Sequence, residues 1–318
     1  LVEEADIIHL HWINQGFLSL RDIERLVKQN KPIVWTMHDM WPCTGICHHA
    51  RDCEKFQTEC ESCFFLKSKG KDLSTSVFDK KMSLYKDANI TFVGCSRWLS
   101  GRAKKSYLLR GKAVLSIPNP IDTKVYHPMD QGMARELLGL PSGKRLLLFG
   151  ALNVTDKRKG IDYLIEALRR MEKQDVELVV FGQVKDDIRG LFPVPIHSMG
   201  YLSDESKIVA LYNAVDMFIT SSLEENLPNT IMESMACGTP CVGFEIGGIP
   251  EMIDHRVNGY VANYKDAGDL ANGIQWVLEH EDRLALSDAC VKKVQENYTE
   301  EVVAKQYTAL YEKLLKGE

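Results

Sequence analysis

Residues 221–240 read SSLEENLPNTIMESMACGTP, and this stretch decides the fold of the second half of the chain. The apolar residues 217–220 just before it predict a strand, and residues 229–237 predict a helix. A further apolar strand is predicted at 240–244. A buried strand, a polar loop and a helix in succession indicate a parallel sheet that is covered by helices.

Two carboxylates, Glu225 and Glu233, flank the predicted start of this helix, with seven residues between them. The free backbone N–H groups and the positive dipole end of a helix start suit a diphosphate. Carboxylates accept hydrogen bonds from vicinal hydroxyls, so one of them is suited to a sugar ring and the other to a ribose. On spacing alone, a surface helix with ordinary acidic residues is an equally good interpretation.

Strands and helices alternate along the whole chain, which predicts an α/β protein with two doubly wound domains. Further strands are predicted at 5–11, 31–36, 90–94, 114–117, 145–149 and 176–181. Further helices are predicted at 20–29, 77–87, 161–173, 204–213, 267–279 and 300–316, and Ser96 is the expected cap of another. We expect an N-terminal domain at 1–143, a C-terminal domain at 144–299, and a return of 300–318 to the first.

Composition excludes several functional classes. The 318 residues carry a net charge of -5, which gives no general attraction to nucleic acid, and no run of eighteen apolar residues spans a membrane. The start of the sequence is acidic and lacks the basic region of a secretory signal. Four of the nine cysteines lie scattered in apolar segments. They are expected to be reduced thiols, as in a cytoplasmic protein.

The stretch around the two carboxylates resembles the Glu-x7-Glu signature of glycosyltransferase family 4, and ESMACGTP at 233–240 is a common form of its second half. Segments 117–122 (IPNPID), 158–160 (RKG), 247–253 (GGIPEMI) and 258–261 (NGYV) are also similar to this family. The resemblance covers nearly the whole chain. It implies a GT-B fold of two Rossmann-like domains, a UDP- or GDP-sugar donor, retention of the anomeric configuration and no catalytic metal.

The resemblance also assigns roles to individual residues. Glu225 is expected to contact donor sugar hydroxyls, Glu233 the nucleotide ribose, and Lys159 the diphosphate, whose charge Lys159 would neutralise in place of a divalent cation. The backbone amides of Asn226 and Leu227 are expected to hold sugar or phosphate. Further donor contacts are expected from the backbone near Gly150, Gly182, Tyr201 and Leu202.

One position departs from the family pattern. An arginine usually follows the glycine that ends the strand at 145–149, whereas Gly150 is followed here by Ala151, and the loop to Lys159 is longer. Arg158 is the expected second cation of the diphosphate site. A solvated lysine in a basic loop is the alternative interpretation of Lys159.

Histidines follow two predicted strands of the first domain. The segment TMHD at 36–39 is similar to the family's histidine loop, whose histidine contacts the donor sugar near the reacting carbon, so His38 is the catalytic-site candidate of this domain. A structural histidine is the alternative. His9 and His11 alternate at another strand end, where a structural role is favoured over one on the acceptor side.

Four cysteines crowd one loop, and their thiols suit a tetrahedral zinc ion that staples the loop: Cys47, Cys53, Cys60 and Cys63. The first pair is spaced more widely than in common zinc ribbons. Two disulfides or unpaired thiols are the alternatives.

Residues 97–112 contain six basic residues and no acidic one, interleaved with apolar residues. One interpretation is peripheral contact with anionic lipid on the inner membrane face, where lipid-linked acceptors reside. The favoured alternative is a core-packed helix with a solvated charged face.

The first strand and glycine-rich loop of a GT-B first domain have no match at the start of the sequence, so we expect that domain to be incomplete. The family resemblance predicts that the protein transfers a sugar to a glycan or lipid-linked acceptor in polysaccharide biosynthesis. A nucleotide-sugar-binding fragment without turnover is the alternative. A sugar-nucleotide epimerase is a third candidate, but the carboxylate pattern favours the transferase.

Overall fold

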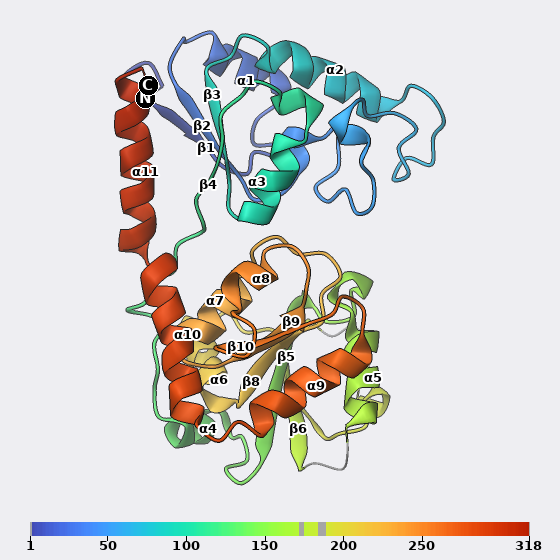
Figure 1. The fold of residues 1–318 in the computed structure, drawn as a ribbon, viewed down its shortest axis with the longest axis vertical. Coiled ribbons are helices and arrows are strands. Elements are labelled where there is room, and N and C mark those ends of the chain that lie inside the picture. Colours follow the sequence, from blue (N-terminus) through green and yellow to red (C-terminus); the bar gives the residue numbers. More distant parts are fainter. Residues whose placement is uncertain (1, 172–174, 184–188, 318) are drawn as a thin grey trace. The chain divides into compact units, whose positions relative to one another are not determined.

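The computed structural model describes residues 2–171, 175–183 and 189–317. The chain forms two compact units (Figure 1). Unit 1 comprises Leu1–Pro118 and Ala304–Glu318, and unit 2 comprises Asn119–Val303. In the described residues, no helix combines the length and the apolar character needed to cross a bilayer.

Unit 1 is built on a parallel four-stranded sheet with the order β1-β2-β3-β4. Its strands are β1 (Ile8–Leu10), β2 (Ile33–Met37), β3 (Ile90–Gly94) and β4 (Val114–Ser116). Its helices are α1 (Leu20–Val27), α2 (Leu73–Tyr85), α3 (Arg97–Lys104) and the part of α11 (Glu300–Leu315) that begins at Ala304. The middle strands β2 and β3 are buried along their whole length, as expected when both faces of a parallel sheet are covered.

Side chains fix the starts of the helices in unit 1. Ser96 accepts a hydrogen bond from the Leu99 N–H at 2.9 Å, so it caps α3 as predicted. Helix α2 begins before the predicted residue 77, because the Asp72 carboxylate accepts hydrogen bonds from the N–H groups of Ser74 and Thr75. These caps determine where each of the two helices begins.

Unit 2 contains a parallel six-stranded sheet with the order β10-β9-β8-β5-β6-β7. Its strands are β5 (Arg145–Asn153), β6 (Val176–Gln183), β7 (Ile196–Gly200), β8 (Met217–Thr220), β9 (Cys241–Phe244) and β10 (Gly259–Ala262). Its helices are α4 (Gln131–Leu138), α5 (Ile161–Arg170), α6 (Glu205–Ala214), α7 (Asn229–Ala236), α8 (Ile249–Met252), α9 (Ala267–Leu278) and α10 (Arg283–Asn297). The strand order reverses between β5 and β8, which is the switch point where doubly wound sheets bind ligands.

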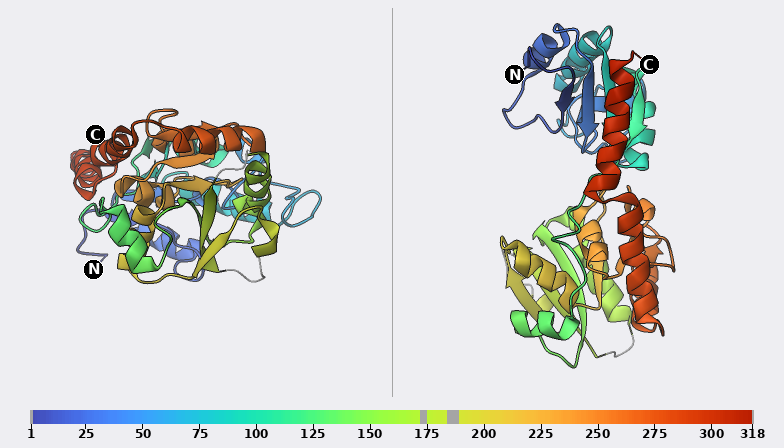
Figure 2. Two further views of the ribbon diagram at one scale, coloured as in Figure 1. Left: turned by 90° about the horizontal axis from the view of Figure 1, so that it is seen from below. Right: turned by 90° about the vertical axis from the view of Figure 1, so that its left-hand side faces the viewer.

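Alternate residues of the strands build the core of unit 2. One face of the sheet packs against α5 and α9, in a cluster that includes Leu147, Phe149, Leu164, Val242, Phe244 and Ile274. The buried residues of α6 and α7 lie outside this cluster, and the two helices contact each other. Helices therefore cover both faces of this sheet (Figure 2). Coverage on both faces leaves the carboxyl ends of the strands as the accessible edge.

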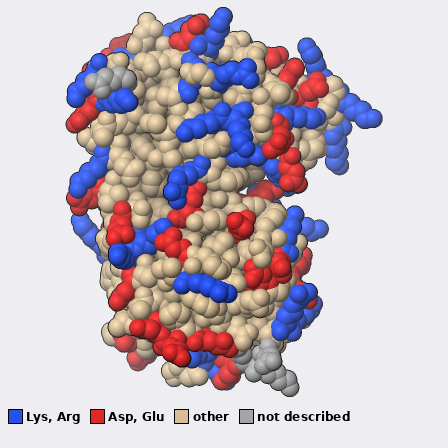
Figure 3. Space-filling model, viewed as in Figure 1, with Lys and Arg blue, Asp and Glu red and all other residues tan. Residues whose placement is uncertain are grey.

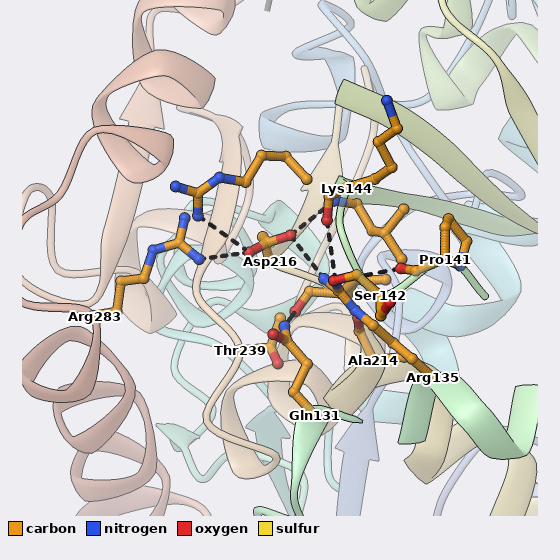
Figure 4. Close-up of polar contacts among 12 residues, drawn as sticks. Gln131, Arg135, Pro141, Ser142, Lys144, Ala214, Asp216, Thr239 and Arg283 are labelled. Carbon is orange, nitrogen blue, oxygen red and sulfur yellow. Dashed lines mark hydrogen bonds and ion pairs between the residues drawn. The ribbon is translucent and has the colours of Figure 1, made fainter. Parts of the chain in front are cut away.

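The boundary between the units lies at Pro118/Asn119 rather than at the predicted residue 143. Helix α4 packs against α6 of unit 2, and Arg135 of α4 anchors it there. The buried Arg135 guanidinium donates to the carbonyl of Ala214 at 2.7 Å and pairs with Asp216 at 3.1 Å (Figure 4). Residues 119–143, which the predicted boundary assigned to the N-terminal domain, are therefore the first part of unit 2.

Candidate donor site at the switch point of unit 2

The loops after β5 and β8 are joined to each other at the switch point. The Leu223 N–H donates to the carbonyl of Arg158 at 2.7 Å, and the Ser221 hydroxyl donates to the carbonyl of Lys159 at 2.9 Å. Gly160 has φ +64°, and a Cβ on it would lie 2.0 Å from the Ser221 carbonyl oxygen. Only glycine permits so close a backbone contact here, so the RKG segment holds Lys159 against the loop after β8.

Lys159 and Glu225, two residues predicted to bind the donor, form an ion pair. The Lys159 Nζ lies 2.5 Å from Glu225 Oε1, and the two side chains are 32% and 15% exposed. A lysine that is held by one carboxylate at a partly buried site has its charge in place before any ligand arrives. In this arrangement the Lys159 ammonium is suited to binding an anion, and the Glu225 carboxylate is suited to accepting hydrogen bonds from hydroxyl groups.

The loop after β9 fixes the backbone of Glu225 and Asn226. Gly247 has φ +60°, and a Cβ there would lie 2.1 Å from the Glu225 carbonyl oxygen. The Gly248 N–H donates to the Asn226 carbonyl at 2.5 Å. Asn226 and Leu227 are both buried. The first glycine of the GGIPEMI segment thus has a structural reason, because it lets this loop lie directly on the Glu225 backbone.

Glu233 lies on α7 and has a partner that the sequence analysis missed. It is the fifth residue of the helix, about 6 Å along the axis from Asn229. The Tyr212 hydroxyl donates to Glu233 Oε2 at 2.7 Å. Burial raises the pKa of Glu233, and the Tyr212 hydrogen bond partly opposes that rise. Tyr212 lies on α6, and no local sequence signal ties it to a residue on the next helix.

The other predicted donor residues lie at the carboxyl ends of β5, β6 and β7. A Cβ at Gly150 would lie 1.8 Å from the Phe181 ring, and a Cβ at Gly182 (φ +120°) would lie 1.7 Å from the Ala151 carbonyl oxygen. Tyr201, just after β7, is 61% exposed, and Leu202 is half-buried. All four positions therefore lie on the accessible edge of the sheet.

Arg158 has another partner in the structure. Its guanidinium pairs with the Asp156 carboxylate, with contacts at 2.6, 3.1 and 3.2 Å. The Arg158 backbone carbonyl, by contrast, accepts the hydrogen bond from the Leu223 N–H that joins the loops after β5 and β8. The guanidinium is about half exposed, so a role as second cation requires exchange of Asp156 for a ligand. That role stays a prediction.

In unit 1, the three histidines lie together at the carboxyl ends of β1 and β2. The His11 and His38 rings are hydrogen bonded at 3.2 Å. His9 is hydrogen bonded to Thr36 at 2.8 Å and to Tyr311 of α11 at 2.6 Å, so both its ring nitrogens have structural partners. Burial lowers the pKa of His38, and burial together with the neighbouring histidines lowers that of His9 to about 4. These rings are neutral at neutral pH.

His11 and His38 also line a small pocket of unit 1, together with Asp39. Asp39 was missed by the sequence analysis as a site residue. Its carboxylate accepts hydrogen bonds from the Trp12 indole at 2.9 Å and the Trp41 N–H at 2.7 Å, and contacts His48 at 2.7 Å. Burial raises its pKa, but these hydrogen bonds outweigh burial and keep the carboxyl ionised. Neutral imidazoles beside a carboxylate suit recognition of hydroxyl groups.

The cysteines predicted to bind zinc are free thiols in one loop of unit 1. Burial raises the pKa of Cys47, and nearby Cys53 and Cys63 raise it further. Burial, with nearby Cys47 and Cys53, raises that of Cys60 to about 11. Within the described residues, however, no three His, Cys, Asp or Glu side chains are arranged to hold a metal ion. The thiols are neighbours but do not complete a site as they stand, so zinc stays a prediction.

A buried lysine holds the start of this cysteine loop. Lys81 of α2 has no exposed surface, and its ammonium donates to the carbonyls of Trp41, Thr44 and Gly45 at 2.6, 3.0 and 3.1 Å. The ammonium also lies 3.3 Å from the centroid of the Trp41 ring. Burial lowers the pKa of Lys81 to about 7. The loop is therefore fixed from its inner side by three hydrogen bonds from one side chain.

Residues 97–112 pack their apolar side chains inward. Leu99, Leu108 and Leu109 are buried, and the Arg102 guanidinium lies over the Phe56 ring at 4.8 Å. The exposed surface of this segment is mainly basic. This arrangement favours the core-packed helix with a solvated charged face.

Residues 143–280 match the family described as Glycosyl transferases group 1. N-acetyl-alpha-D-glucosaminyl L-malate synthase of Bacillus anthracis is 24% identical over 213 residues, which are 65% of this chain and 55% of that protein. N,N'-diacetylbacillosaminyl-diphospho-undecaprenol alpha-1,3-N-acetylgalactosaminyltransferase of Campylobacter jejuni is 33% identical over 118 residues, 37% of this chain and 31% of that protein. The matches therefore span about half or less of these relatives.

Among solved structures, Anabaena HepE in complex with UDP has a TM-score of 0.73 to this chain at 16% identity. The alignment covers 97% of this chain and 79% of HepE. At this identity the likeness concerns the fold alone. It confirms the predicted GT-B class, an α/β architecture with two parallel sheets.

Proposed function

We propose that the chain is a retaining glycosyltransferase that uses a UDP- or GDP-sugar donor, because residues 143–280 match the Glycosyl transferases group 1 family. The observation that carries this proposal is the Lys159–Glu225 ion pair at the switch point of unit 2. One cation and one carboxylate are the groups that a sugar diphosphate requires at its two ends. They are fixed at the edge of the sheet where doubly wound folds bind nucleotides.

In this proposal, the donor separates the two partners of the ion pair. Lys159 moves its hydrogen bonds to the diphosphate, and the Glu225 carboxylate becomes free to accept hydrogen bonds from sugar hydroxyls. The first N–H groups of α7 add positive dipole, because the helix has no side-chain cap at Pro228. Glu233, positioned by Tyr212, accepts hydrogen bonds from the ribose.

The chemical step breaks the bond between the anomeric carbon and the diphosphate oxygen, while an acceptor hydroxyl forms a new bond to that carbon. Negative charge builds on the leaving diphosphate, and a fixed cation stabilises that charge more in the transition state than in the ground state. Lys159 thus supplies what a divalent cation supplies in other transferases. The proton of the acceptor hydroxyl passes to a phosphate oxygen of the leaving group.

We propose that His38 of unit 1 contacts the donor sugar. Its lowered pKa makes it a neutral partner for a hydroxyl or a carbonyl group, which suits recognition without charge competition at the diphosphate. The acceptor is proposed to be a glycan or a lipid-linked sugar. The relative from Campylobacter jejuni, whose name contains diphospho-undecaprenol, supports the lipid-linked choice.

The experiment is a donor screen followed by two substitutions. UDP-, GDP- and ADP-sugars are tested for stabilisation of the chain in thermal unfolding, and the best donor is then tested for hydrolysis and transfer. Glu225→Ala and Lys159→Ala are each expected to lower turnover by about a hundredfold. Donor binding without turnover in the unmodified chain would favour the nucleotide-sugar-binding alternative. Donor affinity that is unchanged in both variants would show that the site assignment is wrong.

A further inference from the structure

Unit 1 carries a cluster of exposed apolar side chains that takes no part in the donor site. Phe64, Phe65 and Leu66, here called the aromatic tip, are 44%, 46% and 39% exposed. They occupy one turn, in which the Leu66 N–H donates to the Cys63 carbonyl at 3.0 Å. The two rings lie against each other, with centroids 4.0 Å apart. Consecutive large apolar residues on a surface mark an interaction site.

The aromatic tip stands on a fixed base. The Cys63 N–H and the Ser68 hydroxyl both donate to the Asp72 carboxylate, the first at 2.8 Å. Ser62 and Gly70 are joined by two hydrogen bonds of 2.8 Å each, which close the loop between them. Asp72 also caps α2, as described above. The exposure of the tip is therefore a property of the folded loop.

Basic side chains surround the aromatic tip. From residue 62 to 71 the sequence contains Lys67, Lys69 and Lys71 and no acidic residue, and all three lysines are exposed. The Arg51 guanidinium carbon lies 5.6 and 5.4 Å from the centroids of the two tip rings. In the space-filling view, Lys and Arg side chains, with Asp and Glu side chains between them, lie at the outer end of the loops beside α2 (Figure 3). The flanking carboxylates are Glu61, which is exposed, and Asp72, which is occupied at the base.

We propose that the aromatic tip and its lysines dock unit 1 onto an anionic phospholipid surface. The partner must accept two aromatic rings and a leucine while it neutralises three or four positive charges. The interface of an anionic bilayer offers both, because aromatic rings settle at the headgroup level and lysines pair with phosphates. The inference goes beyond the proposed transfer reaction and does not depend on it.

This placement differs from the segment that the sequence suggested. Residues 97–112 offer exposed basic groups, but their leucines are buried and are not available for insertion. Electrostatic attraction alone gives weak binding that salt removes, whereas apolar insertion adds a part that salt does not remove. The aromatic tip combines both contributions within one closed loop.

The test is co-sedimentation of the full chain with vesicles of phosphatidylcholine, alone or mixed with phosphatidylglycerol. The chain is expected to bind the mixed vesicles. The double variant Phe64→Ser/Phe65→Ser is expected to bind at least about tenfold more weakly. The triple variant Lys67→Gln/Lys69→Gln/Lys71→Gln is expected to lose the preference for phosphatidylglycerol.

Matched controls separate the tip from general surface effects. Met133→Ser/Leu137→Ser removes two side chains of α4 that are 65% and 63% exposed, and it should leave vesicle binding unchanged. The triple control replaces exposed lysines elsewhere in the chain by glutamine: Lys207, Lys292 and Lys316. Unchanged melting temperatures would show that every variant is folded.

Three results would overturn the proposal. The first is an unmodified chain that fails to bind mixed vesicles at low salt. The second is a Phe64→Ser/Phe65→Ser variant that binds them as tightly as the unmodified chain. The third is an unmodified chain that self-associates and does not bind vesicles, together with a Phe64→Ser/Phe65→Ser variant that no longer self-associates. The aromatic tip would then be a contact between two copies of the protein.

Discussion

Replacing Gly160 by alanine tests whether the junction between the loops after β5 and β8 positions Lys159. Gly139 provides the control, because its φ of +66° nearly equals the +64° of Gly160, yet a Cβ on it meets no atom within 4 Å. Gly139→Ala therefore measures only the conformational cost of a left-handed alanine, about 1 kcal/mol. Any excess loss in Gly160→Ala comes from the contact with the neighbouring loop.

The excess can be worked out from the geometry. The new Cβ would lie 2.0 Å from the Ser221 carbonyl oxygen, so that oxygen must retreat by about 1 Å or more. The two hydrogen bonds that join the loops, at 2.7 and 2.9 Å, would be weakened or lost, at about 1 kcal/mol each. We expect Gly160→Ala to cost about 3 kcal/mol of unfolding free energy in total, against about 1 for Gly139→Ala.

The assay is urea unfolding of both variants, followed by titration with the nucleoside diphosphate of the best donor. Displacement of Lys159 by about 1 Å should weaken nucleotide binding by about tenfold or more in Gly160→Ala and leave it unchanged in Gly139→Ala. Equal losses of stability in the two variants, with nucleotide affinity intact in both, would refute the reasoning.

Three further predictions concern buried charges and the cysteine loop. Lys81→Met leaves three buried carbonyls without a donor and should cost about 3 kcal/mol or more in urea unfolding, whereas the exposed neighbour Lys80→Met should cost little. A loss of equal size in both would contradict the role of Lys81. Because burial raises the pKa of Glu233, the folded state holds that proton more tightly than the unfolded state, and this source of stability is lost as pH rises through the folded pKa. Glu233→Gln should therefore be more stable than the unmodified chain at neutral pH and should bind the donor more weakly. Tyr212→Phe removes the hydrogen bond that lowers the pKa of Glu233, so the acid limb of a plot of donor affinity against pH should shift to higher pH. An acid limb that does not move would count against the Tyr212–Glu233 contact. Protein purified without chelator is expected to contain about one zinc ion per chain, and metal analysis well below that value would dismiss the predicted site at Cys47, Cys53, Cys60 and Cys63.

The second half of the chain was predictable where its signals are local. The strand at 217–220, the loop with Glu225 and the helix at Asn229–Ala236 follow from one contiguous pattern, and the structure has all three. Helix α10 was missed, because its buried residues form a stripe of only one per turn: Leu286, Cys290 and Val294. Strand β7 was missed because IHSMG is short, polar and only half-buried, which matches no strand pattern.

Contacts between distant segments account for what the sequence did not predict. A lysine in a helix is normally solvated, and nothing local distinguishes the buried Lys81 from the exposed Lys80. In the same way, Tyr212 donates a hydrogen bond to Glu233 from a different helix. The Asp39 carboxylate is hydrogen bonded to Trp12, which precedes it in the sequence, and to His48, which follows it. Such partners depend on how elements pack, which no spacing within one element reveals.

The most direct test of the account compares two neighbouring lysines of the short 3-10 helix Lys157–Lys159. Lys157 is exposed, whereas Lys159 is partly buried and pairs with Glu225. The affinity for UDP or GDP, measured by isothermal titration, is predicted to fall at least about tenfold in Lys159→Ala, or about 1.4 kcal/mol, and to change little in Lys157→Ala. Equal affinities in both variants and the unmodified chain would contradict the claim that Lys159 binds the donor diphosphate.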